Sequence, residues 1–315
     1  MKAITIISLL GSLTLASSLS AQTLAPAYVF DRDGEIETVF VEAASEKTVR
    51  YRRSERSTNR IDTRLNSITI KFLKPKEFAI AEALYENGRF EDALAEFTKT
   101  REKYEFSEDV PGNYSTLAGF YEMECARKLG NYTKLAELRR QFQPEPLLLE
   151  SDKEKYRIGE CYEAVEAKSW SRLTNLAKGW VDKKLSPPLR AEVSYLLGLG
   201  YKGEEKYEDA LVELNRAIVS NAGSDLVQTK NAVIACFEIF ETYPIVVEAR
   251  RVHGTPAEEP NSPGNALLGE AAALVTVWEQ AHTNGEKLPS KYREYLKYAT
   301  AEPEPAAEEK KDEKK

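Results

Sequence analysis

The chain has 315 residues, of which 42% are apolar and 30% are charged, and its net charge is −7. So many apolar residues can bury a core, which excludes a wholly disordered chain. Two histidines and three cysteines are too few for a multi-ligand zinc site or an iron–sulfur cluster. The acidic balance argues against a protein whose main partner is nucleic acid. We therefore expect no cofactor, no metal and no nucleic-acid partner.

The first 21 residues have the three-part layout of a secretory signal peptide. Lys2 supplies a positive charge, residues 3–19 carry no charge, and the small residues of 18–21 suit cleavage after Ser20 or Ala21. The alternative is a membrane anchor, but about 17 residues diluted by Ser and Thr are at the short limit of a span. We expect a bacterial protein that is periplasmic or secreted, with no transmembrane segment after cleavage.

The three cysteines, Cys125, Cys161 and Cys236, are odd in number and widely spaced. Such a set does not indicate a disulfide framework, even in an exported protein. All three lie in apolar, helix-like surroundings, so we expect them to be buried as small hydrophobic residues. A bridge between Cys125 and Cys161 is the remaining alternative.

Residues 27–75 alternate between apolar and polar positions and are rich in β-branched and aromatic residues, which predicts short β-strands. Five strands are expected, at 28–30, 36–41, 48–51, 60–63 and 68–72. So small a sheet is expected to close into a barrel, because closure removes its exposed edges. In the number and length of its strands this segment resembles an SH3-like or Sm-like barrel.

The same region is basic. Residues 45–76 hold ten Lys or Arg against three acidic residues, a net charge of +7 in an acidic protein. One interpretation is a patch that binds an anionic envelope polymer, a lipid headgroup or an acidic protein. The other is a solvated rim of loops that pairs with acidic helices. The residues of the candidate anion-binding patch are Arg50, Arg52, Arg53, Arg56 and Arg60.

A repeated pattern fills the middle of the chain, where an aromatic residue stands three residues before a small or apolar one. Phe90 precedes Ala93 and Tyr207 precedes Ala210, and both copies have further matching positions upstream. Weaker copies are Tyr132 with Leu135 and Trp170 with Leu173. Small residues let two helices approach closely, and an aromatic residue fills the gap between them.

In these positions the chain resembles the tetratricopeptide repeat, a stack of helix pairs. The resemblance implies a mainly α-helical solenoid behind a small all-β domain. The expected segments are a signal peptide at 1–21, the β domain at 27–75, repeats at 76–250, a loop at 251–265, capping helices at 266–299 and a disordered charged tail at 300–315.

In this repeat family the first helix of each pair lines a concave groove that commonly receives a peptide or protein. Carried over position by position, the groove mixes tyrosines with charges of both signs, as adaptable contact surfaces do. The family's basic clamp for carboxylates is not matched. The alternative is that these are ordinary exposed helix residues. The predicted groove residues are Glu82, Tyr85, Phe120, Glu124, Arg127, Lys128, Tyr162, Val165, Tyr195 and Lys202.

None of the sequence motifs that mark nucleophile elbows, phosphate loops or metalloprotease helices occurs. We therefore expect a non-enzymatic scaffold or adaptor of the bacterial cell envelope, binding a protein or peptide through the groove. The alternative function is an anion- or glycan-binding envelope protein in which the basic β domain does the binding.

Overall fold

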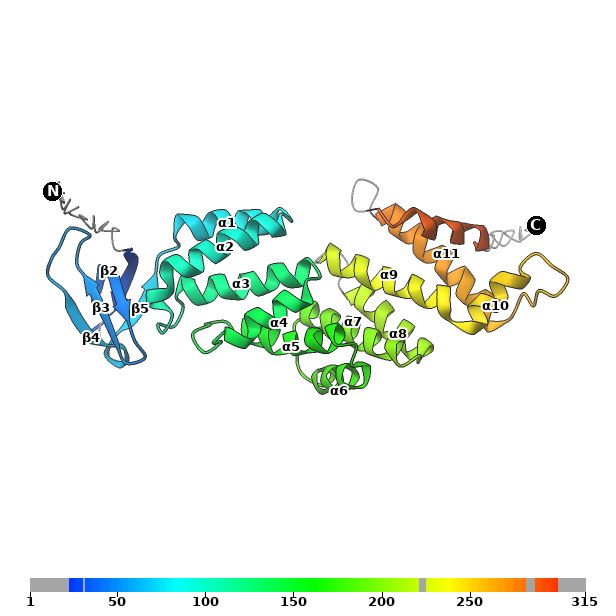
Figure 1. Cartoon of the computed structure of the whole chain (residues 1–315), viewed down its shortest axis with the longest axis horizontal. Coiled ribbons are helices and arrows are strands. Elements are labelled where there is room, and N and C mark those ends of the chain that lie inside the picture. Colours follow the sequence, from blue (N-terminus) through cyan, green and yellow to red (C-terminus); the bar gives the residue numbers. More distant parts are fainter. Residues whose placement is uncertain (1–22, 31, 221–224, 282–286, 300–315) are drawn as a thin grey trace, which may run out of the picture.

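The computed structural model describes residues 23–30, 32–220, 225–281 and 287–299 (Figure 1). The predicted signal peptide and the predicted charged tail lie outside these residues. A small antiparallel sheet is followed by α-helices that pack in adjacent pairs, which confirms the predicted fold class. Among the described helices, none combines the length and apolar character needed to cross a membrane.

The sheet has five strands, and each lies where the alternating pattern predicted one. They are β1 (Ala25–Phe30), β2 (Ile36–Ala44), β3 (Thr48–Arg52), β4 (Ile61–Arg64) and β5 (Thr69–Phe72). All neighbours are antiparallel, in the order β4-β3-β2-β1-β5. β4 and β5 are therefore the two edges, and the barrel that we expected is not closed by backbone pairing between them.

The core of the sheet is not made of strand residues alone. Its inner face, with Val29, Val39 and Val41, packs in one buried cluster with Tyr104 and Val110 from the helical part of the chain. The predicted boundary near residue 75 therefore separates two kinds of secondary structure that share one core.

The helices follow as successive pairs along the stack in Figure 1. The first three pairs are α1 (Lys76–Glu86) with α2 (Phe90–Tyr104), α3 (Tyr114–Lys128) with α4 (Tyr132–Gln141), and α5 (Glu150–Glu166) with α6 (Trp170–Val181). The next are α7 (Pro187–Gly203) with α8 (Tyr207–Ser220), and α9 (Leu226–Thr242) with α10 (Pro244–Val252). The chain then forms α11 (Pro263–Ala281) and a 3-10 helix, η3 (Ser290–Tyr298).

The turns inside the first four pairs are alike, although their sequences differ. In each three-residue turn the middle residue has a positive φ, at Gly88, Gly130, Lys168 and Glu205. The following residue then donates its N–H to the carbonyl five residues earlier, at 2.9 Å in all four turns. This pattern is the 6→1 bond that ends a helix with a left-handed residue. Four pairs are thus closed by the same backbone device.

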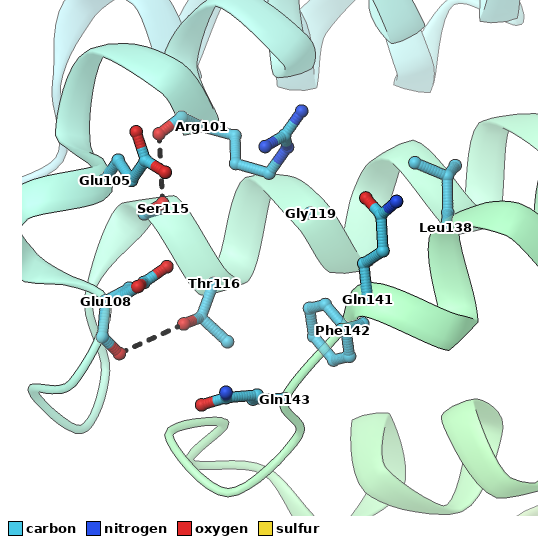
Figure 2. A pocket seen from close by; sticks show the side chains of 10 residues that line it. All are labelled: Arg101, Glu105, Glu108, Ser115, Thr116, Gly119, Leu138, Gln141, Phe142 and Gln143. Carbon is cyan, nitrogen blue, oxygen red and sulfur yellow. Dashed lines mark hydrogen bonds between the residues drawn. The ribbon is translucent and has the colours of Figure 1, made fainter.

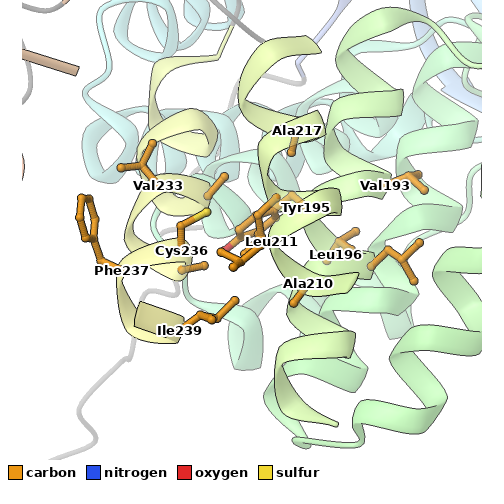
Figure 3. Packing of buried hydrophobic residues seen from close by; sticks show 14 of the residues in the cluster. Val193, Tyr195, Leu196, Ala210, Leu211, Ala217, Val233, Cys236, Phe237 and Ile239 are labelled. Carbon is orange, nitrogen blue, oxygen red and sulfur yellow. The ribbon is translucent and has the colours of Figure 1, made fainter. Parts of the chain in front are cut away.

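Close packing explains the small residues of the predicted pattern. Ala210 is fully buried among the apolar residues of α7, α8 and α9 (Figure 3). A Cβ atom added at Gly198 of α7 would lie 2.7 Å from Cγ of Leu214 on α8, and one at Gly203 would lie 2.1 Å from the Trp170 ring. The glycines therefore let α7 approach both its own partner and the pair before it.

Three tyrosines of η3 cover the last apolar face of the stack. Tyr292 stacks on Phe237 of α9 with ring centroids 4.3 Å apart, and Tyr295 lies 5.5 Å from the same ring. The helix expected at the C-terminal end of the stack is α11, which buries Ala271 and Trp278. It begins at Pro263, so the predicted loop is shorter than expected.

Candidate functional site

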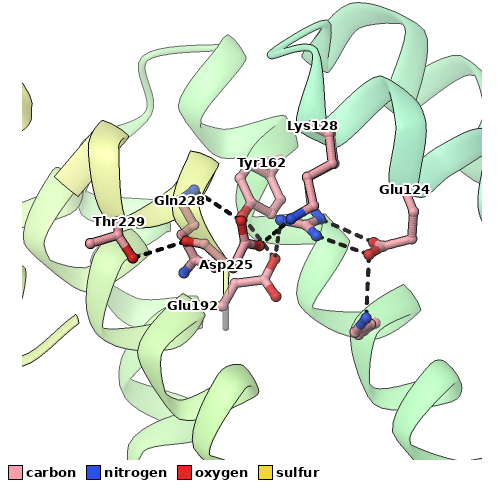
Figure 4. Close-up of polar contacts among 9 residues, drawn as sticks. Glu124, Lys128, Tyr162, Glu192, Asp225, Gln228 and Thr229 are labelled. Atoms are coloured by element: carbon pink, nitrogen blue, oxygen red, sulfur yellow. Dashed lines mark hydrogen bonds and ion pairs between the residues drawn. The ribbon is translucent and has the colours of Figure 1, made fainter. Parts of the chain in front are cut away.

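Four of the residues that we predicted to line an open groove belong instead to a buried polar cluster inside the stack (Figure 4): Glu124, Arg127, Lys128 and Tyr162. The chain curves until the start of α9 reaches the end of α3, where Lys128 forms an ion pair with Asp225, 97 residues away. The cluster therefore lies where α3, α5, α7 and α9 converge.

Arg127 is the centre of this cluster. Its guanidinium donates two hydrogen bonds to Glu124, at 3.0 and 2.9 Å, and lies 3.5 Å from Glu192. Lys155 contacts the same Glu124 carboxylate at 3.3 Å, and the Tyr162 hydroxyl donates to Glu192 at 2.8 Å. Paired charges with several hydrogen bonds are the form in which buried ionic groups are tolerated.

The surroundings shift the pKa values of these groups in opposite directions. Burial alone would raise the pKa of Glu124, but the charges of Arg127 and Lys155 outweigh it and hold that pKa well below its ordinary value. Burial and the neighbouring Arg127 lower the pKa of Lys128. Burial raises the pKa of the Tyr162 hydroxyl well above its ordinary value. The carboxylate of Glu124 therefore stays charged in the folded protein.

Packed side chains fill the predicted groove at four of its ten positions. Phe120, Glu124, Tyr162 and Tyr195 are buried. The other six predicted groove residues are half-buried: Glu82, Tyr85, Arg127, Lys128, Val165 and Lys202. The two hollows that touch the cluster have volumes of about 10 Å³ each, the space of a single water molecule. The inside of the stack at this level has no room for a peptide, and the residues are not ordinary exposed ones either.

The sequence reasoning missed four members of the cluster, Lys155, Glu192, Asp225 and Gln228. Glu192 had a detectable signal, because it is a charged residue beside the apolar run of residues 193–201. Asp225 and Gln228 had none, since only the curvature of the stack brings the start of α9 to α3. Gln228 is buried, and its side-chain nitrogen has no hydrogen-bond partner within the described residues.

The predicted anion-binding patch is largely neutralised by the sheet itself. Glu42, whose side chain is only 3% exposed, pairs with Arg52 at 2.6 Å and with Arg60 at 2.8 Å. Arg50 pairs with Asp62 at 2.8 Å, and Arg53 pairs with Glu37 at 2.7 Å. Only Arg56 of the five is exposed without a carboxylate partner in the described part of the chain. The rim interpretation therefore fits better, although all three acidic partners are strand residues and none is a helix residue.

A hollow with a volume of about 660 Å³ lies where the sheet meets the helices. We call it the junction groove. One wall is β5, and the other is formed by the start of α3 and the segment before α5. On that second wall Leu148 and Leu149 expose 72% and 62% of their surface. The apolar lining residues are Leu65, Ile68, Ile70, Phe72, Val110, Leu117, Leu147, Leu148 and Leu149.

A smaller hollow of about 200 Å³ lies between α2, α3 and α4 (Figure 2). Its walls are mostly polar, and Arg101 is held by an ion pair with the buried Glu122 at 2.6 Å. Ser115 donates to the carbonyl of Arg101 at 3.0 Å, so the hollow is spanned by contacts that also join α2 to α3. Two of its polar residues, Arg101 and Ser115, thus hold the two helices together.

All three cysteines are free and buried, so the alternative of a Cys125–Cys161 bridge is wrong. Burial raises the pKa of each thiol to about 12. Among the residues that the structure describes, no group of three or more His, Cys, Asp or Glu is placed to hold a metal ion.

No protein-family model matches this sequence, and comparison with curated proteins gives no significant match.

Proposed function

We propose that this protein is a non-enzymatic scaffold that binds another protein in the envelope of a bacterium. The observation that carries the proposal is the junction groove, an apolar hollow of about 660 Å³ between the sheet and the helices. Exposed apolar side chains that gather in one hollow are a feature of interaction sites. The partner surface is thus the junction groove, in place of the concave groove expected from the repeat family.

Two further features support the scaffold proposal. The four alike turns and the small residues between helices are what tetratricopeptide-like repeats would contain, and such stacks commonly present binding surfaces. The N-terminal sequence supports export, and with it a periplasmic or secreted location.

The anion-binding alternative is supported only by the exposed cations that have no acidic partner. Lys47, Arg56, Arg64 and Lys71 are exposed and pair with no carboxylate in the described residues. If the basic β domain were the binding part, Arg56→Glu would abolish retention on anionic vesicles or cell-wall material. Arg52 is unsuitable for this test, because its loss would leave the buried Glu42 with fewer partners.

The scaffold proposal is tested by affinity capture from envelope extract of the native host. We expect the wild-type protein to retain discrete proteins, and the variant with Leu148→Glu and Leu149→Glu to lose them. The matched control carries Val212→Glu and Val219→Glu, because these valines of α8 are exposed and lie outside the junction groove. Equal capture by all three proteins, or no captured protein at all, would overturn the proposal.

A further inference from the structure

The outer edge of β5 has no neighbouring strand within the described sheet, since β5 pairs only with β1. The N–H of Leu73 donates to the carbonyl of Pro26 at 2.9 Å, which fixes the phase of this ladder. In an antiparallel pair every second residue bonds to the neighbour, so Thr69 and Lys71 also face β1. The backbone N–H and C=O groups of Ile70 and Phe72 consequently point away from the sheet.

The junction groove runs along this edge. All four residues of β5 line it, although successive side chains of a strand point to opposite faces. A hollow that touches them all must lie beside the strand rather than over one face. The outward backbone groups of Ile70 and Phe72 therefore meet a hollow whose far wall is apolar.

The far wall is held in place before any partner arrives. Gly112 has a φ of +76° and donates its N–H to the carbonyl of Pro146 at 2.8 Å. The positive φ favours glycine at this position, and a Cβ atom there would lie 2.7 Å from Cδ1 of Leu148, so that side chain would have to shift. The buried Asn113 side chain donates to the carbonyls of Glu108 and Val110, both at 2.8 Å. A preformed wall lowers the entropic cost of binding.

We propose that an extended peptide of a partner protein binds here as a sixth strand, pairing with Ile70 and Phe72 of β5. Unpaired strand edges bind extended peptides through main-chain hydrogen bonds, while side-chain pockets give specificity. The peptide places apolar side chains at alternate positions in the junction groove. This inference rests on the proposed scaffold function and names the chemistry of its partner.

The positions between the apolar ones are acidic. Lys71 is exposed on the outer face of β5 and forms no ion pair within the described residues. An added strand places every second side chain beside Lys71, and opposite charges across strands stabilise pairing. Asp152, the acidic residue of the lining, stands on the opposite wall at α5. A peptide with alternating apolar and acidic residues therefore matches both the apolar wall and the basic edge.

The experiment uses a synthetic peptide of alternating Val and Glu, seven residues long, with the Val–Lys counterpart as control. Amide hydrogen exchange of the whole protein is measured with and without each peptide. We expect the Val–Glu peptide to slow exchange at Ile70 and Phe72, with little change at Thr69 and Lys71, whose amides already bond to β1. Unchanged exchange at Ile70 and Phe72 would overturn strand addition.

Variants separate the backbone and charge contributions. Ile70→Pro removes an outward N–H without touching the ladder to β1, and should weaken the Val–Glu peptide about tenfold, whereas Ile70→Val should not. Lys71→Glu should weaken binding of the Val–Glu peptide by a similar factor and should not weaken binding of the Val–Lys peptide. A peptide with N-methyl groups on the residues that face β5 tests the same bonds in unaltered protein, so a misfolded Ile70→Pro variant leaves the test intact.

Two other results would count against the proposal in distinct ways. If sedimentation shows a dimer that Ile70→Pro abolishes, the occupant of the edge is a second copy of this chain. If envelope proteins are captured through Leu148 and Leu149 while the peptide leaves the amides of β5 unaffected, the scaffold function stands and strand addition is wrong.

Discussion

At the scale of single residues, the four alike turns give a direct test of backbone conformation. Gly130 has a φ of +68°, and no atom lies within 4 Å of the place where a Cβ would be. A change to alanine there acts on the backbone alone. Left-handed conformations cost L-residues about 1–2 kcal/mol, and the reduced freedom of the unfolded chain offsets part of this cost. We predict that Gly130→Ala lowers the free energy of unfolding by about 1 kcal/mol, measured by urea denaturation.

The reciprocal change serves as the control. Lys168 is exposed and occupies the equivalent position with a φ of +50°. Lys168→Gly removes the left-handed strain, so the protein should be as stable as wild type or more stable by up to about 1 kcal/mol. Marked destabilisation by Lys168→Gly would show that the two turns are not equivalent.

The buried polar cluster depends on Arg127. Arg127→Met leaves Glu192 without its charged neighbour and Glu124 with Lys155 alone, in a place that water barely reaches. Removing one partner of a buried ion pair typically costs about 3–5 kcal/mol, and we predict a loss of this size. Arg157→Met is the matched control, because Arg157 pairs with Glu150 at 2.9 Å on the surface and such pairs contribute about 0–1 kcal/mol.

The same cluster should make stability depend on acid. The pKa of Glu124 is depressed in the folded protein, so its stabilising effect is complete above the ordinary pKa of 4.5 and is lost as pH falls below it. We predict that wild type and Glu124→Gln differ by a constant free energy of unfolding near neutral pH, and that the difference shrinks below about pH 4.5. A difference that stays constant down to pH 3 would contradict the assigned ion pairs.

At the scale of elements, Ala210 marks the close approach of α8 to its neighbours. It is fully buried, while the adjacent Asp209 is exposed. Ala210→Leu forces a larger side chain into a packed contact, which should cost about 1–3 kcal/mol and lower the melting temperature. Asp209→Leu adds the same side chain one position away and should change stability little. Equal melting temperatures for wild type and Ala210→Leu would contradict the close helix contact.

The elements themselves could be predicted because their signals are local. Aromatic residues such as Phe90, Tyr132 and Trp170 stand at the first position of the second helix of a pair, as the repeated pattern implied. The strands followed the period-two alternation in the same way. The buried polar cluster could not be predicted, because the residues that face inward in each helix do not reveal how tightly the stack curves. That curvature appears only in contacts such as Lys128 with Asp225.

At the scale of the whole molecule, export is the prediction that lies outside the described residues. A bacterial signal peptidase should remove about 20 residues, because small residues follow the apolar stretch at that distance. Mass spectrometry of the protein from its native host should show Ala21 or Gln22 as the first residue. Recovery of an intact Met1 from the soluble envelope fraction would contradict this prediction.

The shared core predicts that the sheet and the first helices unfold together. Val110 belongs to the helical part of the chain but is buried against strand residues such as Val39 and Val41. Val110→Ala leaves a cavity there and should cost about 2 kcal/mol. Because the sheet has no other core, the loss should accelerate hydrogen exchange of the β2 amides by about 30-fold, the factor that 2 kcal/mol represents.

The control for this experiment is Val212→Ala, since Val212 is exposed on α8 and touches none of the sheet. That variant should leave exchange in β2 at the wild-type rate. If Val110→Ala also left the β2 amides unchanged while lowering the stability of the helices, the sheet would be an independent folding unit. The junction groove would then lie between two parts that can separate, and its preformed wall would no longer favour peptide binding.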